Sequence, residues 1–329
     1  AALVVAVLAA QSNPDLAIGA ATAGQAVNIQ NQLNYTRDFE READRLGLSL
    51  LERAGFDVRG MESFFERLQK YGRLYDNNTP GYLRTHPLTT ERLADIGNRI
   101  QGRPYKQVAD SLEFQLIRAK LRAQEGAAQD AIIYFDTQLK NKTYRGNVAA
   151  VHYGLSQSYL RAGNLVMAEK SLATIRQLKV ESSLFLTLAA ALRMKQNDAP
   201  GAVAILRKAY VSYPKERAVV YALVDALLAS GQAKEALRIT EDDLLSHSSD
   251  ANAHTLQAKT YAMLGRRLQQ HRAQAEAYAL SGRLGEAISQ LELAQKAGDG
   301  SFHEQSQVDA RLREFRARRE EEKKLINGK

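Results

Sequence analysis

The sequence predicts an all-α protein, and three features of its composition and patterning lead to that prediction. Residues that favour helices, chiefly alanine, leucine, glutamine, arginine and glutamate, dominate the 329 positions, and proline occurs only 6 times. No segment alternates apolar and polar side chains over the length of a strand. Glycine or asparagine instead recurs at a regular interval between segments of helix length. A chain this long has room for two domains.

The composition also excludes several classes of site and partner. There is no cysteine, which rules out disulfides, cysteine-based zinc fingers and a thiol nucleophile. The formal charge of +8 raises the question of nucleic acid, but basic and acidic residues are interleaved, as in 311–324. Tryptophan is absent and aromatic residues make up only 7% of the chain, so base-stacking surfaces are not evident. We therefore predict no nucleic-acid partner.

The first 34 residues consist mainly of small, apolar and amide residues. The run 1–10 lacks a preceding basic segment and is much shorter than the roughly 20 residues of a membrane span. Because the sequence begins with alanine inside this run, we expect it to be a fragment of a longer protein. Residues 1–34 suit either tightly packed helices or a segment in peripheral contact with a membrane surface, and both alternatives remain open.

A helix is predicted from Thr36, as N-cap, to about Ala54, with Gly55 ending it. Its apolar residues recur at the spacing of one helical stripe: Phe39, Ala43, Leu46 and Leu50. Beside the stripe, Glu40 and Asp44 lie four residues apart, so both carboxylates leave the same face of the helix. This spacing suits either an ordinary solvated face or a metal ligand with a supporting carboxylate.

Two further helices and a loop complete the first domain. One helix is predicted over 60–71, with Met61, Phe64, Phe65 and Leu68 on its buried side. A long loop, 72–87, ends in His86 and Pro87, and a second helix follows over 88–100. Gly102-Arg103-Pro104 predicts a domain boundary, so the domains are 1–102 and 103–329.

The second domain repeats with a period of 34 residues. Gly163, Asn197, Gly231 and Gly265 are each 34 residues apart, which is the period of tetratricopeptide repeats. Glycine or asparagine accepts the left-handed backbone of the turn between paired helices. An alanine follows five residues after most of the turns, where it lets the pair pack closely: Ala131, Ala168, Ala202, Ala236 and Ala287.

The register of the repeats shifts near the end of the chain. Gly231 and Gly282 are 51 residues apart, which is one period plus a half. We therefore expect the helix after Gly265 to pack both with the helix before it and with the helix after it. Residues 303–324 predict a charged capping helix, which buries Val308, Leu312 and Phe315.

No catalytic motif is complete in the 329 residues. The sequence contains no HExxH, no phosphate-binding glycine loop and no convincing Ser/His/Asp set. The six histidines are His86, His152, His247, His254, His271 and His303. His152 occupies a packing position of the repeat, so we predict a structural role for it, and surface or loop positions for His247, His254 and His271.

The residues 40–44, EREAD, resemble the E-x-x-A-D helix of the HtpX-like zinc metallopeptidases. The longer segments EREADRLGLSLLERAGFD and THPLTTERLADIGNR, followed by tetratricopeptide repeats, resemble the members of this family that carry such repeats. The resemblance covers essentially the whole sequence. It implies the C-terminal part of a zincin-type helical peptidase domain followed by a tetratricopeptide solenoid.

The resemblance also implies roles for individual residues. Glu40 corresponds to the glutamate that is the third zinc ligand of the family, and Asp44 to the carboxylate that orients a ligating histidine. His86 corresponds to a regulatory histidine that can occupy the open zinc position. Arg92 corresponds to an arginine near the cleft, for which binding of the substrate carbonyl or the transition state is suggested.

The function implied by the resemblance is that of a periplasmic zinc endopeptidase in outer-membrane protein assembly and quality control. The repeat groove would dock outer-membrane proteins or their assembly machinery. Because a catalytic zinc needs three protein ligands and HExxH is missing, we expect these 329 residues to be inactive by themselves. The alternative is a non-enzymatic tetratricopeptide adaptor.

Overall fold

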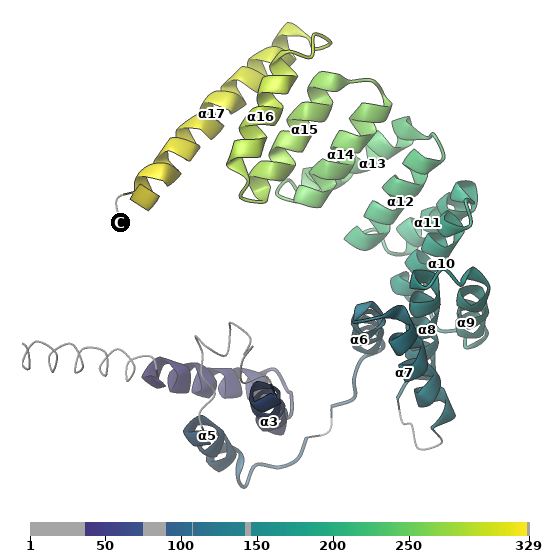
Figure 1. Cartoon of the computed structure of the whole chain (residues 1–329), viewed down its shortest axis with the longest axis vertical. Helices are drawn as coiled ribbons and strands as arrows, with labels where there is room; N and C mark the ends of the chain where they lie inside the picture. The colour runs from purple at the N-terminus through teal and green to yellow at the C-terminus, as the bar shows by residue number, and fades with distance from the viewer. Residues whose placement is uncertain (1–36, 75–89, 107, 142–145, 328–329) are drawn as a thin grey trace, which may run out of the picture. The chain divides into compact units, whose positions relative to one another are not determined.

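The computed structural model describes residues 37–74, 90–106, 108–141 and 146–327, and these ranges contain helices and no strand (Figure 1). The all-α prediction is therefore confirmed. The protein divides into two compact units, Ala1–Ala109 and Asp110–Lys329, which we describe separately as unit 1 and unit 2. His86 and residues 1–34 lie outside the described residues. No helix in the described ranges is long and apolar enough to span a membrane.

Unit 1 contains a helix at 37–53, α3 (Arg59–Leu74) and α5 (Thr90–Ile100). The first helix ends just before Gly55, the residue predicted to stop it, which has a φ of 85°. Five buried side chains from these helices and the turn between them form the core: Leu48, Val58, Phe65, Ile96 and Ile100. With so small a core, the polar contacts between the helices contribute to their relative positions.

The predicted apolar stripe on helix 37–53 faces away from this core. Phe39, Leu46 and Leu50 are 66%, 51% and 62% exposed, whereas Asp44 is only 6% exposed. The face that carries the carboxylates therefore lies inward, because it finds both the apolar core and a buried arginine there. The prediction for α3 was correct for Phe65 but wrong for Phe64, which is exposed.

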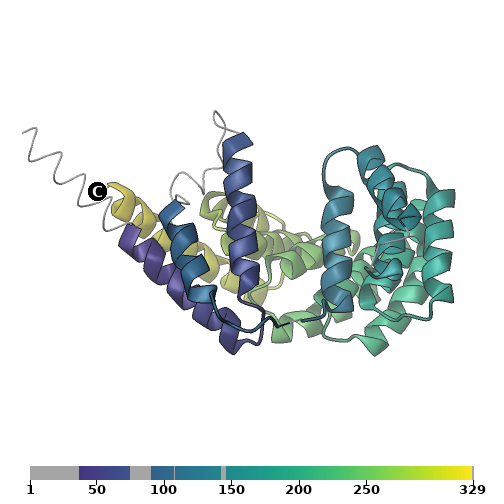
Figure 2. The same cartoon turned by 90° about the horizontal axis from the view of Figure 1, so that it is seen from below.

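Unit 2 is a succession of antiparallel helix pairs (Figures 1 and 2). Its helices are α6 (Leu112–Gln124), α7 (Ala128–Lys140), α8 (Val148–Arg161), α9 (Leu165–Gln177), α10 (Ser183–Lys195), α11 (Ala199–Ser212), α12 (Arg217–Ala229), α13 (Ala233–Ser246), α14 (Ala251–Met263), α15 (Arg267–Leu280), α16 (Leu284–Gln295) and α17 (Phe302–Asn327). Successive first helices of the pairs, α6, α8, α10, α12 and α14, contact one another, whereas successive second helices touch at most marginally. The first helices thus line one side of the stack.

The turns between paired helices adopt the backbone that the repeat pattern predicts. The values of φ are 76° at Gly163, 60° at Asn197 and 77° at Gly231. All five alanines that follow the turns are at most 1% exposed: Ala131, Ala168, Ala202, Ala236 and Ala287. Both features of the 34-residue pattern are confirmed.

The register shift has the predicted structural consequence. Helix α15 packs against α14 on one side and α16 on the other, so it belongs to two pairs at once. Helix α17 covers α16 and ends the stack. Its side chains Val308, Leu312 and Phe315 are buried, as expected for a cap on the last pair.

Candidate functional site

The candidate site in unit 1 is a buried group of one arginine and two carboxylates. Arg92 Nε donates to Asp44 Oδ2 at 2.7 Å, and Arg92 Nη2 donates to Asp44 Oδ1 at 2.7 Å. Arg92 Nη1 lies 2.9 Å from Glu40 Oε2. The side chains of Arg92 and Glu40 are only 8% and 13% exposed. A planar guanidinium suits this bidentate arrangement, which a lysine could not reproduce.

Local structure brings these three residues together. Glu40 and Asp44 project from successive turns of helix 37–53, and Arg92 lies in the first turn of α5. The Arg92 guanidinium also lies 5.5 Å from the centre of the Phe65 ring, so α3 contributes an aromatic surface to the group. The site is thus assembled from the three helices that the structure describes in unit 1.

Two outer ion pairs hold α5 along helix 37–53. Arg41 Nη2 lies 2.6 Å from Glu91 Oε1, near the start of α5, and Arg103 pairs with Glu52 beyond its end. These pairs are exposed and contribute little stability individually. Together with the buried group they restrict the sliding of one helix on the other.

The described residues fit a zinc ion only in part. Glu40 is a carboxylate of the kind zinc accepts, yet no group of three or more His, Cys, Asp or Glu side chains that could hold a metal occurs in the described ranges. His86 cannot be placed, because it lies outside those ranges. The donors that the structure describes are therefore insufficient for a catalytic zinc, and the role of Glu40 as a ligand remains a prediction.

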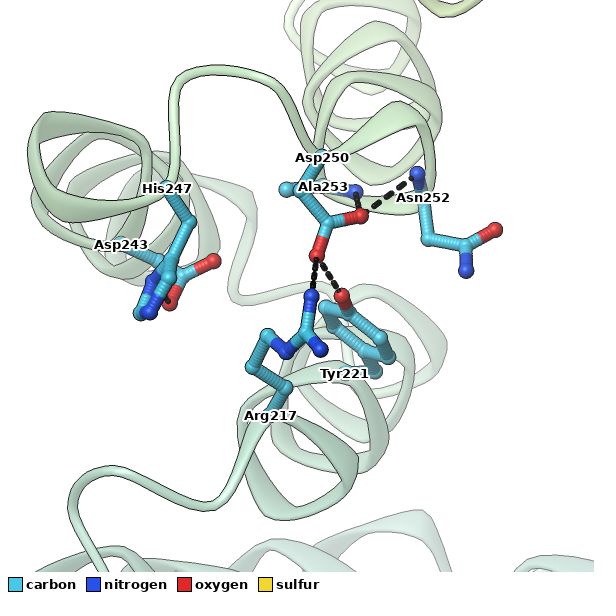
Figure 3. A network of polar contacts seen from close by, with 7 residues as sticks. All are labelled: Arg217, Tyr221, Asp243, His247, Asp250, Asn252 and Ala253. Atoms are coloured by element: carbon cyan, nitrogen blue, oxygen red, sulfur yellow. Dashed lines mark hydrogen bonds and ion pairs between the residues drawn. The ribbon is translucent and has the colours of Figure 1, made fainter. Parts of the chain in front are cut away.

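A second polar group, in unit 2, was not predicted from the sequence (Figure 3). Asp250 is the N-cap of α14 and accepts hydrogen bonds from the backbone N–H groups of Asn252 at 2.9 Å and Ala253 at 3.2 Å. Its other oxygen accepts from Arg217 at 3.0 Å and from the Tyr221 hydroxyl, both on α12. One carboxylate thus caps a helix and joins two repeats.

The surroundings of Asp250 perturb two pKa values in opposite directions. Burial alone would raise the pKa of Asp250, but hydrogen bonds from Tyr221, the Ala253 N–H and Arg217 outweigh it, so the pKa is lowered. Burial, together with the Asp250 carboxylate, raises the pKa of Tyr221. The pair therefore stays as carboxylate and neutral phenol at physiological pH.

Most histidines of unit 2 are partly buried, whereas His303 is exposed. His247 Nδ1 lies 3.0 Å from Asp243 Oδ1, and His271 Nδ1 lies 2.8 Å from Gln290 Oε1. His152 Nδ1 is buried without a hydrogen-bond partner, and burial lowers the pKa of this imidazole. The packing position predicted for His152 agrees with this burial.

Comparison with known proteins identifies both parts of the chain. Residues 1–100 match peptidase family M48, and residues 193–260 match the tetratricopeptide repeat. The beta-barrel assembly-enhancing protease of Escherichia coli is 31% identical over 94% of this chain and 63% of its own length. A putative beta-barrel assembly-enhancing protease of Vibrio cholerae is 29% identical over 97% of this chain and 66% of its own length.

The chain thus spans a little under two thirds of the length of the curated relatives it matches. One solved structure, MamA 41-end from Desulfovibrio magneticus RS-1, is 19% identical and aligns with a TM-score of 0.40, covering 52% of this chain and 97% of that chain. This score is too low to support an argument. The two family matches and the relatives agree with the resemblance seen in the sequence: the first 100 residues are similar to peptidase family M48, and helical repeats of the tetratricopeptide type follow.

Proposed function

We propose that this chain is part of a periplasmic zinc metalloendopeptidase that acts in the assembly and quality control of outer-membrane β-barrel proteins. One observation supports a functional rather than a merely structural role for the site: Arg92 joins Glu40 and Asp44 in a buried group within the segment that matches the M48 peptidases. The names of the relatives, which are called beta-barrel assembly-enhancing proteases, support the biological setting.

In this proposal Glu40 is one zinc ligand, and zinc, when bound, would polarise the substrate carbonyl and activate water. Arg92 holds Glu40 by its Oε2 atom, and Asp44 holds Arg92 by two hydrogen bonds. Asp44 therefore acts on Glu40 through the arginine, besides the histidine-orienting role that the resemblance implies. Arg92 has the further proposed role of contacting the substrate carbonyl.

The remaining zinc ligands are proposed to come from an HExxH helix in another part of the protein, because the 329 residues contain none. His86 is proposed to act as a regulatory ligand. The 329 residues alone are then expected to show no zinc-dependent cleavage. A longer form that contains an HExxH helix should cleave casein and contain zinc.

The substitution Glu40→Gln in such a longer form tests the ligand assignment. We expect the zinc content, measured by mass spectrometry, and the casein cleavage to fall together, because the amide is a much weaker ligand than the carboxylate. Glu42→Gln is the matched control, since Glu42 instead forms an exposed pair with Arg45. Normal zinc content in the Glu40→Gln protein would remove Glu40 from the ligand set.

Replacement of His86 tests the regulatory assignment. If His86 occupies the open zinc position, His86→Ala should raise basal casein cleavage without lowering the zinc content. Unchanged or reduced cleavage with full zinc occupancy would contradict that role. A longer form that binds no zinc at all would favour the alternative, a tetratricopeptide adaptor without peptidase activity.

The repeats are proposed to dock β-barrel clients or their assembly machinery along the first helices. The contacts between successive first helices support this choice, because they leave one continuous side of the stack made of α8, α10, α12 and α14. Polar pairs connect neighbouring helices on this side, for example Lys259 with Asp225 at 3.2 Å. Repeat proteins commonly use a continuous side of this kind as a recognition surface.

A further inference from the structure

The first repeat of unit 2 contains two arginines at positions that hold buried leucines in the repeat formed by α12 and α13. Gly126 forms the turn after α6, and Gly231 forms the turn after α12. Counted back from these two glycines, Arg118 and Arg122 correspond to Leu223 and Leu227. The two leucines are buried, at 1% and 0% exposure. The side chains of the two arginines remain 60% and 40% exposed. The first repeat thus has two partly exposed cations where the repeat of α12 has two buried leucines.

These arginines line a cavity of about 40 Å³ between α6, α7 and α8. Gln115 and Gln138 add amide groups to the wall, and small or apolar side chains form the remainder: Ala119, Tyr134, Phe135, Ala150 and Val151. A water molecule requires roughly 10–15 Å³ on this measure. The cavity thus has room for about three atoms, the number in a carboxylate group.

The Arg122 side chain is fixed in place but incompletely paired. Its guanidinium stacks 4.6 Å from the centre of the Tyr134 ring, which limits its movement. Its Nε atom is buried and has no hydrogen-bond partner. An N–H group in that situation costs free energy, and an oxygen acceptor that reached it through a small movement of the side chain would remove that cost.

The carboxylates already near the cavity do not occupy this position. Glu125 contacts Arg122 through Nη1 and is 62% exposed, and Asp110 lies 3.6 Å from Arg118 Nη1 and is 46% exposed. Both are pairs at the surface, which contribute little and exchange readily. They can be displaced by a ligand carboxylate, and Glu125 would compete with it.

We propose that the cavity lined by Arg118 and Arg122 is a binding pocket for a carboxylate of a polypeptide. Arginine forks bind planar carboxylates through two parallel hydrogen bonds, and the cavity is matched to that group. The carboxylate can come from an acidic side chain or from the C-terminus of the polypeptide, and both present the same three atoms. This pocket lies in the repeats, so it does not depend on the proposed zinc site.

The test uses the full 329-residue protein with ¹⁵N-labelled arginine and follows the Nε–H signals by NMR. The two probes are N-acetylglutamine, whose carboxylate is on the main chain, and its isomer N-acetylglutamic acid α-amide, whose carboxylate is on the side chain. We expect at least one isomer to shift the Arg122 signal saturably, at matched ionic strength, while chloride does not. The isomer that binds more tightly identifies the source of the carboxylate.

Three variants make the test specific. Arg122→Lys should weaken binding by about tenfold, because the charge remains while the fork and Nε are lost. Arg193→Lys is the matched control, because Arg193 has the same position relative to the turn in α10 but does not line this cavity, and binding should be unchanged. Glu125→Gln should strengthen binding by roughly two- to fivefold, since it removes a competing exposed carboxylate.

The Glu125→Gln result guards against misfolding, because a damaged pocket would not bind more tightly. An Arg122 signal that responds equally to chloride and to both isomers would overturn the proposal. So would equal weakening by Arg122→Lys and Arg193→Lys.

Discussion

At the scale of single residues, Arg92 decides how unit 1 is arranged. Glu40, Asp44 and Arg92 were all predicted to be site residues. Arg92 was placed near the two carboxylates only because the sequence resembles a known family. Residue spacing could not predict that the Arg92 guanidinium contacts both carboxylates, because 48 residues separate Asp44 from Arg92. The same contact explains why the stripe of Phe39, Leu46 and Leu50 faces outward, against the usual reading of an apolar stripe. The buried ion pair, and not the apolar stripe, therefore determines which face of helix 37–53 lies inward.

Asp44→Asn should therefore destabilise unit 1 strongly. The amide keeps the size of the side chain but leaves the buried Arg92 with one fewer charged partner, and breaking a buried pair costs about 3 kcal/mol. Asp95→Asn is a control on the same helix as Arg92, since the Asp95–Arg99 pair is exposed and should contribute less than ~1 kcal/mol. Urea unfolding followed by circular dichroism measures both changes. Equal effects of the two substitutions would show that the buried group is not special.

At the scale of elements, close approach between helices depends on small residues whose role the sequence shows only in part. The turn glycines and the following alanines were predictable, because they recur with the repeat. Gly154 does not recur in that way, and its importance appears only in the structure. A methyl group added at Gly154 would overlap the ring of Phe135 on α7, whereas Gly163 has open space but a φ of 76°.

Gly154→Ala should destabilise unit 2 through overpacking, by about 1–3 kcal/mol, partly offset by the better helix propensity of alanine. Gly163→Ala should cost about 1 kcal/mol through backbone strain alone. Phe135→Leu distinguishes the two causes in double-mutant cycles. It should relieve the Gly154→Ala effect by about 1 kcal/mol and be additive with Gly163→Ala. Additivity in both cycles would contradict the overlap with Phe135.

The junction between α12 and α14 should make unit 2 sensitive to acid. The pKa of Asp250 is lowered in the folded protein from its usual 3.8, so the unfolded chain takes up its proton first as the pH falls. The stability that Asp250 contributes is therefore complete above about pH 4 and is lost as the pH falls through the folded pKa. Asparagine is an equally good N-cap but carries no charge.

We expect Asp250→Asn to lower the free energy of unfolding by about 1–2 kcal/mol at pH 7, because it weakens the bond to Arg217. The difference from the unsubstituted protein should shrink as the pH falls from about 4 to 2, because Asp250 then becomes neutral. Denaturant unfolding at a series of pH values measures it. A difference that stays constant across that range would mean that the charge of Asp250 does not contribute.

At the scale of the whole molecule, the sequence specified the repeats well and unit 1 only roughly. The repeats depend on contacts between neighbours in the chain, so their period, turns and capping helix follow from local patterns. The doubled role of α15 could be predicted for the same reason. The site in unit 1 depends on contacts between distant segments, and the arrangement of such contacts leaves no periodic signal.

The limits of the two domains follow from the same reasoning and can be tested by truncation. The sequence predicts a boundary after 102, but Arg59 Nη2 donates to the carbonyl of Arg103 at 3.0 Å, and the Arg59 guanidinium lies 5.5 Å from the Tyr105 ring. These contacts are with unit 1, whereas α6 begins with its own cap, Ser111, which accepts a hydrogen bond from the Phe114 N–H. Residues 110–329 should therefore fold without 103–109.

Thermal unfolding of the two truncated proteins, 103–329 and 110–329, measures this. We expect the same midpoint within about 2 °C, because the contacts described for Arg103 and Tyr105 are with Arg59 of unit 1, and their loss should change the stability of the repeats little. A third truncation, 110–264, removes α15 to α17 and should unfold at a clearly lower temperature, since α14 then loses the helix that covers it. A lower midpoint for 110–329 than for 103–329 would mean that residues 103–109 belong to the repeats. The boundary predicted at Gly102-Arg103-Pro104 would then describe the domains better than a boundary at 109.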